Sequence, residues 1–348
     1  MKPMRVMVTG HKGYVGSVLV PVLERAGHLV QGLDTDYYRG CDLLPPPRVP
    51  ETIKDLRDVT VQDLQGVEAI VHLAALSNDP IGNLNSGWTE AINVDGTARL
   101  ADAARLAGVR RFLFASSCIM YGVADEADVD ERSPLNPQTD YAASKVAAES
   151  ILSGLASDAF VPVLLRNGTI YGLSPRMRFD TVLNSLVGAA LTTGRITVLG
   201  DGKPWRPVVH LRDVARAFLA VLEAPDADVG NQAINIGSDA LNIRIADLAQ
   251  AAKDAIPEAE LEVLQRPDAD QRTYRTSFAK FARLFPSFEF EFTPSSGAAE
   301  LAASLRAAGV EPADYTSDRF TRLKRIRRLV DEGQVDDDLR WRQAQEAA

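Results

Sequence analysis

The chain is poor in the residues that build disulfide frameworks and metal sites. Its 348 residues include two cysteines, Cys41 and Cys118, and four scattered histidines, without CxxC or HxxxH spacing. No apolar run approaches the roughly 20 residues of a membrane span, and no secretion signal precedes the first predicted strand. The net charge of -9 disfavours a nucleic-acid partner. We therefore expect a cytoplasmic, reduced, soluble protein with no metal and no membrane or nucleic-acid partner.

What the sequence does contain is an alternation of strand-like and helix-like segments up to about residue 171. Runs such as MRVMVTG, HLVQGLD and VEAIVHLAA alternate with longer amphipathic runs. This predicts an α/β fold with a doubly wound parallel Rossmann sheet in residues 1–171, to which the chain returns at about 207–236. Residues 172–206 and 237–318 are predicted to form a smaller mixed α/β substrate-binding lobe. Residues 319–348 are predicted to be a charged helical tail, solvated or packed on another subunit.

Three glycines separate the first predicted strand from the first predicted helix. In VMVTGHKGYVGS, Gly10 permits a tight turn, Gly13 lets the backbone approach a pyrophosphate, and Gly16 lets helix and strand pack closely. The helix start offers free N–H groups to phosphate. Asp34 ends the next predicted strand, where a carboxylate binds adenosine ribose hydroxyls and repels a 2′-phosphate. The pattern predicts an NAD site, and a purely structural turn is the alternative.

Tyr141 and Lys145 have YxxxK spacing in TDYAASKVAAE. Four residues are about one helical turn, so both side chains share a face. A lysine cation stabilises a phenolate, lowering the phenol pKa from about 10, and such a tyrosine can take a proton from a hydroxyl while hydride leaves the same carbon. The alternative is a packed tyrosine beside a surface lysine. Ser117, some two dozen residues upstream in FASSCIMYG, favours the catalytic interpretation.

Together these motifs resemble the extended short-chain dehydrogenase/reductase family, in its NAD-dependent nucleotide-sugar epimerase/dehydratase branch. The resemblance covers roughly residues 4–306 and rests on TGHKGYVG, Asp34, DLRD, HLAA, INVDGT, SSCIMYG, YAASK, LRNGTIYG and GDGKPWRPVVHLRDVARA. It implies that Ser117 orients the substrate oxygen, Tyr141 acts as base and acid, and Lys145 is its partner. The cofactor-binding residues that it implies are Gly10, Gly13, Tyr14, Val15, Gly16, Asp34, Asp55, Leu56, Leu73, Ala74, Ala75, Asn93, Tyr141 and Lys145.

Two positions depart from the dehydratases of this family. Those enzymes carry an acidic pair where this sequence has Cys118 and Ile119, and family decarboxylases carry a glutamate at the Ile119 position. Family 3,5-epimerases place a catalytic cysteine at that same position, one residue beyond Cys118, and a slip of one residue turns a side chain to the other face. We therefore expect Cys118 to be a small buried filler bordering the substrate rather than a catalytic thiol. Because Ile119 cannot move a proton, the resemblance implies hydride chemistry alone.

The expected substrate contacts follow from the same resemblance. Arg206 in GDGKPWRPVV matches a family arginine that pairs with a diphosphate, and Thr169 replaces a family asparagine. His210 is expected to be structural, and the loop 75–83 is a candidate wall of the sugar pocket. The expected substrate-binding set is Ser117, Cys118, Tyr141, Asn167, Thr169, Arg176, Arg178, Asn184 and Arg206.

The sequence thus predicts an NAD-dependent epimerase of a nucleotide-diphosphate sugar, with transient oxidation at C4 and re-reduction on the opposite face. A homodimer packed through the YxxxK helix is expected. One alternative is a 4-keto-sugar reductase of deoxysugar biosynthesis, against which Asp34 weighs because such reductases usually use NADPH. The other is a non-catalytic NAD-binding member of the fold, against which the intact Ser117, Tyr141 and Lys145 weigh.

Overall fold

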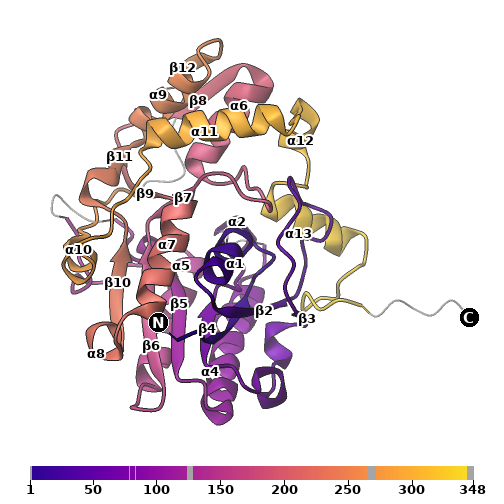
Figure 1. The fold of residues 1–348 in the computed structure, drawn as a ribbon. Helices are drawn as coiled ribbons and strands as arrows, with labels where there is room; N and C mark the ends of the chain where they lie inside the picture. The colour runs from indigo at the N-terminus through magenta and orange to yellow at the C-terminus, as the bar shows by residue number, and fades with distance from the viewer. Residues whose placement is uncertain (1, 78, 83, 124–127, 265–271, 343–348) are drawn as a thin grey trace, which may run out of the picture.

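A seven-stranded parallel sheet forms the lower half of the molecule in Figure 1. The computed structural model describes residues 2–77, 79–82, 84–123, 128–264 and 272–342. The strands lie in the order β10-β6-β5-β4-β1-β2-β3, and all six pairings are parallel. They are β1 (Arg5–Thr9), β2 (Leu29–Asp34), β3 (Glu51–Ile53), β4 (Ala69–His72), β5 (Arg111–Ser117), β6 (Val161–Asn167) and β10 (Gln232–Ile236). The predicted Rossmann sheet is confirmed.

Helices cover both faces of this sheet because its central strands are apolar on both sides. Val6 and Val8 of β1 pack with α1 and α7, whereas Met7 between them packs with α4 and α5 on the opposite face. These helices are α1 (Gly16–Arg25), α4 (Gly96–Ala107), α5 (Asp140–Gly154) and α7 (Leu211–Glu223). The sheet order reverses between β1 and β4, and ligands of such folds bind at the carboxyl ends of the strands beside this reversal.

A smaller lobe lies above the sheet in Figure 1 and has its own apolar core. One mixed sheet contains β7 (Thr169–Tyr171), β9 (Trp205–His210) and β11 (Asn242–Arg244), and a parallel pair contains β8 (Arg195–Leu199) and β12 (Glu260–Leu264). Its longer helices are α6 (Val182–Thr193), α9 (Ile245–Ala255) and α11 (Pro294–Ala307). The predicted smaller mixed lobe is therefore confirmed.

One predicted strand is divided in two. Within the segment VPVLLRNGTIYG, β6 of the large sheet ends at Asn167, and β7 of the smaller mixed sheet begins at Thr169. Gly168 lies at the crossing, where a Cβ atom would come within 3.1 Å of the carbonyl oxygen of Pro207. The close backbone approach explains why glycine stands there.

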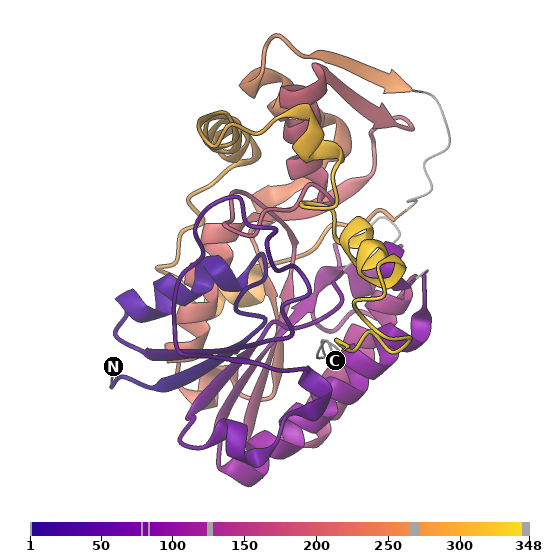
Figure 2. The same cartoon turned by 90° about the vertical axis from the view of Figure 1, so that its right-hand side faces the viewer.

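The C-terminal segment packs on its own chain, unlike the solvated or subunit-packing tail that was expected. Its helix α13 (Arg322–Asp331) buries Arg322, Ile326 and Leu329. Figure 2 shows the yellow tail descending from the lobe to lie beside the lower half. The other helices are short: α2 (Asp79–Gly82), α3 (Ser86–Thr89), α8 (Asp226–Val229), α10 (Ala279–Leu284) and α12 (Pro312–Thr316). Within the described ranges, no helix combines the length and apolar character that crossing a membrane requires.

Candidate active site

A cavity of about 460 Å³ lies above the carboxyl ends of the central strands, and residues of the lobe line part of it. It brings together residues from the glycine loop, the ends of β2, β4 and β5, helix α5 and the segment after β6. Of the predicted catalytic, cofactor-binding and substrate-binding residues, all but Asp55, Asn93, Cys118 and Asn184 line it. Those that do are Gly10, Gly13, Tyr14, Val15, Gly16, Asp34, Leu56, Leu73, Ala74, Ala75, Ser117, Tyr141, Lys145, Asn167, Thr169, Arg176, Arg178 and Arg206.

The glycine loop has the close backbone contacts that a dinucleotide site requires. Gly10 has a φ of +74°, and a Cβ atom there would lie 2.8 Å from the backbone nitrogen of Ala74. At Gly16, a Cβ atom would lie 2.3 Å from the carbonyl oxygen of Gly10. No side chain caps α1, and the helix begins at Gly16, which lines the cavity, so the positive end of its dipole faces the site of a phosphate. The loop therefore fits a pyrophosphate.

Asp34 is fixed at the end of β2 by two backbone donors. Its carboxylate accepts hydrogen bonds from the amides of Lys12 at 3.0 Å and Asp36 at 2.8 Å. Burial raises the pKa of this carboxyl. Each carboxylate oxygen has a further lone pair, so the group can still accept from ribose hydroxyls. The residues present thus fit a dinucleotide with an unmodified adenosine ribose.

Three buried polar atoms of uncharged side chains in the cavity wall lack a hydrogen-bond partner among the described residues. They are Ser116 Oγ, Asn167 Oδ1 and Thr181 Oγ1. Buried polar groups of folded proteins are almost always hydrogen-bonded. The cavity therefore suits a polar ligand with several donors and acceptors.

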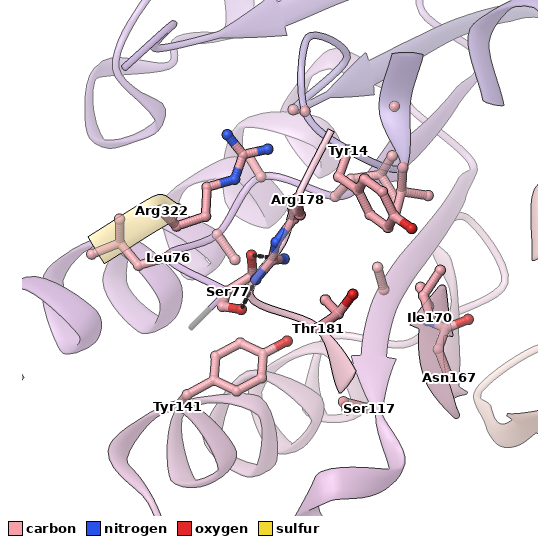
Figure 3. A pocket seen from close by; sticks show the side chains of 18 of the residues that line it. Tyr14, Leu76, Ser77, Ser117, Tyr141, Asn167, Ile170, Arg178, Thr181 and Arg322 are labelled. Carbon is pink, nitrogen blue, oxygen red and sulfur yellow. Dashed lines mark hydrogen bonds between the residues drawn. The ribbon is translucent and has the colours of Figure 1, made fainter. Parts of the chain in front are cut away.

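The predicted catalytic side chains converge at one end of the cavity. Figure 3 shows Tyr141 on its helix with the hydroxyl pointing into the cavity, and Ser117 at the end of its strand. The Thr139 side chain accepts a hydrogen bond from the Ala142 amide, which begins α5 at Asp140 and places Tyr141 in its first turn.

Lys145 lies one turn further along α5. Its Nζ lies 5.7 Å from the ring centroid of Tyr141 and donates to the carbonyl of Ala115 at 2.7 Å. Burial lowers the pKa of Lys145 to about 7, and the charge of Glu149 opposes this decrease. A lysine with this pKa exchanges protons near neutral pH, as a proton-transfer site requires.

The cavity is strongly cationic although the chain is acidic. Among the described residues, seven cationic side chains and only three carboxylates line it. The cationic residues are Lys12, Lys145, Arg176, Arg178, Arg206, Arg272 and Arg322, and the carboxylates are Asp34, Asp36 and Asp180. Such a balance attracts a polyanionic small molecule and suits two diphosphates.

Comparison with known proteins agrees with this geometry. The sequence model of the NAD dependent epimerase/dehydratase family matches residues 6–237. This chain belongs to that family. NAD is the family's cofactor, and the predicted resemblance to nucleotide-sugar epimerases and dehydratases is confirmed.

The relatives of this chain differ from one another in the reaction that they catalyse. A UDP-glucose 4-epimerase of Mycolicibacterium smegmatis is 33% identical over 250 residues, which cover 68% of this chain and 77% of that protein. The solved NAD-dependent NDP-hexosamine 5,6-dehydratase TunA superposes with a TM-score of 0.78 at 26% identity, over 87% of this chain and 98% of that one. A UDP-glucose 4-epimerase of Thermus thermophilus, solved with NAD, gives a TM-score of 0.74 at 25% identity, over 88% and 100%.

Cys118 does not border the cavity of this family member, contrary to the expected substrate contact. The side chain is fully buried, and its thiol donates to the carbonyl of Arg166 at 3.2 Å. Burial raises the thiol pKa, so a reactive thiolate is disfavoured. Because Cys118 follows the last residue of β5, the side chain points behind the sheet edge, whereas Ser117 and Ile119 line the cavity.

Behind the cavity, the Arg166 side chain makes a buried ion pair. Arg166 on β6 donates to both carboxylate oxygens of Glu149, with the shortest contact at 2.7 Å. Its guanidinium also donates to the hydroxyl of Tyr121 at 3.0 Å. These contacts join α5 to the sheet one turn beyond Lys145.

Asn93 and Asn184 do not line the cavity, but their side chains hydrogen-bond to residues next to it. The Asn93 amide bonds both backbone groups of Leu76, at 2.8 and 3.2 Å, and reaches this point from a π-helical turn over Glu90–Asp95. Asn184 accepts from the Gly172 amide at 2.9 Å and donates to the Tyr14 hydroxyl at 3.0 Å.

The remaining predictions concern the edges of the site. Asp55 is paired with Arg57 at 2.7 Å, and its neighbour Leu56 lines the cavity instead. In the loop 75–83, residues 75–77 line the wall, whereas residues 78 and 83 lie outside the described residues. His210 caps α7 and stacks on Phe292 with ring centroids 3.7 Å apart.

Sequence reasoning missed Lys12, Asp36, Tyr38, Arg272 and Arg322, all of which line the cavity. Lys12 stands inside the glycine loop and Asp36 two residues beyond Asp34, so proximity to motifs could have indicated both. No motif points to Arg322, which enters from the C-terminal helix.

Proposed function

We propose that this protein is an NAD-dependent epimerase that inverts C4 of a nucleotide-diphosphate hexose. The observation that carries the proposal is the apolar side chain of Ile119 beside Ser117 in the wall of the cavity. Elimination of water from a sugar needs an acid and a base in addition to the tyrosine. Ile119 supplies neither, which supports reversible oxidation without dehydration.

The carboxylates that line the cavity are engaged elsewhere. Asp34 accepts two backbone hydrogen bonds, Asp36 is paired with Lys12 at 3.1 Å, and Asp180 is paired with Arg178 at 2.8 Å. Among the described lining residues, none is an acid positioned beside Ile119. This arrangement supports an epimerase over a dehydratase, although the relatives include both.

In the proposed reaction, Tyr141 accepts the proton of the C4 hydroxyl through its phenol oxygen. Ser117 Oγ donates a hydrogen bond to the same substrate oxygen and holds it near the phenol. The Lys145 ammonium stabilises the phenolate. NAD, when bound, supplies the reversible hydride acceptor. After the keto-sugar has turned in the cavity, Tyr141 returns the proton to the alcohol of inverted configuration.

Arg206 is proposed to bind the diphosphate of the substrate. It lies on β9 and lines the cavity together with Arg272, whose backbone carbonyl accepts from the Arg206 guanidinium. A guanidinium held in this way can direct its remaining donors to phosphate oxygens. Thr169 begins β7, which pairs with β9, and Asn167 ends β6; both line the cavity and are proposed to contact the sugar.

The test is turnover of nucleotide-sugars without added cofactor. Purified protein is incubated with UDP-glucose, UDP-glucuronic acid and dTDP-glucose, and the products are separated by ion chromatography. We expect one of them to be converted into its 4-epimer. Formation of a 4-keto-6-deoxy sugar, or stoichiometric NADPH consumption with a 4-keto sugar, would contradict the proposal.

A matched pair of variants ties the activity to this site. Tyr141→Phe should lose turnover and still bind NAD, since only the phenol oxygen is removed. Ile119→Val should keep turnover, since the wall remains apolar. Full activity of Tyr141→Phe would refute the assignment.

We also propose that the protein is a cytoplasmic homodimer packed through α5. The outward face of this helix carries the exposed small residues Ala143 and Ser150, which allow close helix packing. Light scattering on the purified protein tests this, and a monomeric mass would contradict it.

A further inference from the structure

Arg322 is a buried cation for which the structure shows no carboxylate partner among the described residues. The side chain is 4% exposed and lines the cavity. Its guanidinium lies 3.7 Å from the ring centroid of Tyr38, and only its backbone amide bonds a carboxylate, Asp180 Oδ2 at 3.2 Å. By contrast, Arg176 is paired with Asp42 at 2.9 Å and Arg178 with Asp180 at 2.8 Å.

A buried guanidinium without an ion-pair partner of its own is costly. Moving a charge out of water is strongly unfavourable unless an opposite charge lies close to it. The Tyr38 ring and the charge of Asp180, which is itself paired with Arg178, offset only part of this cost. Burial lowers the pKa of Arg322 to about 10, so the group still carries its charge at neutral pH. The cavity therefore has a fixed positive charge that an anionic ligand would neutralise.

The fold holds this side chain in position from two sides. On the lobe side, the carbonyl of Phe320 accepts from the amide of Phe179 at 2.9 Å. On the other side, the Tyr37 hydroxyl donates to the carbonyl of Leu339 at 2.5 Å, and the Trp341 indole donates to the carbonyl of Thr35 at 2.6 Å. The tail thus joins the lobe to the loop that follows β2.

The location of Arg322 favours the cofactor over the sugar nucleotide. Its contact Tyr38 belongs to the loop that starts at Asp34, the proposed ribose ligand. In Figure 3, Arg322 lies beside Leu76 and Arg178, away from Ser117 and Asn167. Arg206, the cation proposed for the substrate, comes from β9 instead, and its neighbour Arg272 from the segment after β12.

We propose that Arg322 binds the phosphate groups of the bound dinucleotide, so that the C-terminal tail is part of the cofactor site. The inference rests on the proposed function in that it takes a retained NAD as the ligand. Arg322 lies outside residues 6–237, which carry the family match. A cofactor bound partly by the tail would stay on the protein between turnovers, as an epimerase without external cofactor requires.

The experiment compares Arg322→Met with two other variants of α13. Arg322→Lys keeps the charge but loses the planar fork, and Arg327→Met removes an exposed arginine of the same helix. NAD is released from each purified protein by denaturation and quantified by chromatography. Its dissociation constant is then measured by calorimetry on the stripped protein, and the Tm is recorded with and without NAD.

We expect Arg322→Met to retain little NAD and to bind it about tenfold or more weakly, as the loss of one charge-assisted contact predicts. Arg322→Lys should be intermediate and Arg327→Met unchanged. Without NAD, the Tm of Arg322→Met should be equal to or above that of the unaltered protein, because an unpaired buried charge has been removed. With NAD, its rise in Tm should be smaller.

Three results would overturn the inference. One is NAD retention in Arg322→Met equal to that of the unaltered protein. Another is weaker UDP binding to the NAD-loaded variant with NAD binding unchanged, which would assign Arg322 to the sugar nucleotide. The third is an equal fall in Tm with and without NAD, which would indicate a packing role. Failure of the proposed function is distinguishable, because the unaltered protein would then show no epimerisation whatever the variants bind.

Discussion

Lys145→Met should change the pH dependence of folding stability in a direction that the structure fixes. Lys145 is 3% exposed, and among the described residues its Nζ donates one hydrogen bond, to the Ala115 carbonyl. The nearby Glu149 carboxylate is occupied by Arg166. Burial therefore lowers the pKa of Lys145 from its usual 10.5 to about 7.

The sign follows from proton binding in the two states. Between pH 7 and about 10.5 the unfolded chain carries a proton on this lysine that the folded chain does not, so stability rises with pH. The free-energy cost of burying the charged lysine acts in full below pH 7 and disappears above about pH 10.5. Each pH unit inside this window is equivalent to at most about 1.4 kcal/mol. From pH 7 to pH 9, the unaltered protein should gain about 2 kcal/mol relative to Lys145→Met.

The assay is urea unfolding of the dinucleotide-free protein at pH 7, 8 and 9, followed by tryptophan fluorescence. Lys203→Met is the control, because the Lys203 side chain is 77% exposed. Its curve should run parallel to that of the unaltered protein. If the Lys145→Met curve is also parallel, the lysine does not titrate near neutral pH and the reasoning is refuted.

Three further predictions concern the supports of the site. Arg166→Met should lower the free energy of unfolding by about 3–5 kcal/mol in urea titrations, because it leaves the Glu149 carboxylate buried and unpaired. Adding Glu149→Leu removes that carboxylate and should restore most of the lost stability. Gly16→Ala should reduce NAD content, measured after denaturation, because its methyl group would lie 2.3 Å from the Gly10 carbonyl oxygen; unchanged content would contradict the glycine-loop assignment. Cys118→Ala should cost about 1–2 kcal/mol and keep most turnover in the epimerase assay, whereas a loss like that of Tyr141→Phe would make the thiol catalytic.

The sequence could predict the features that depend on neighbouring residues. Glycines between a strand and a helix need backbone geometry that is local, so Gly10, Gly13 and Gly16 indicated the nucleotide loop. The YxxxK spacing spans one helical turn, so the spacing alone places Tyr141 and Lys145 on one face of a helix. The continuous apolar runs in the sequence indicated parallel strands that are buried on both faces.

Side-chain direction and distant packing depended on the tertiary structure. Cys118 and Asn184 stand near motif residues in sequence, yet one points behind the sheet edge and the other supports Gly172 and Tyr14. Their directions depend on how a strand ends and how a loop closes, which spacing alone does not specify.

The tail shows the difference most clearly. By itself, the sequence determined the Rossmann sheet, the glycine loop and the catalytic spacing, because each is encoded within a few turns or strands of chain. Only the tertiary structure placed Arg322 next to Tyr38, across 284 positions of sequence, since that contact depends on the joint packing of the tail against the lobe and the loop after β2. A helix rich in arginine can equally be solvated, and only its buried face decides which arginine enters a cavity.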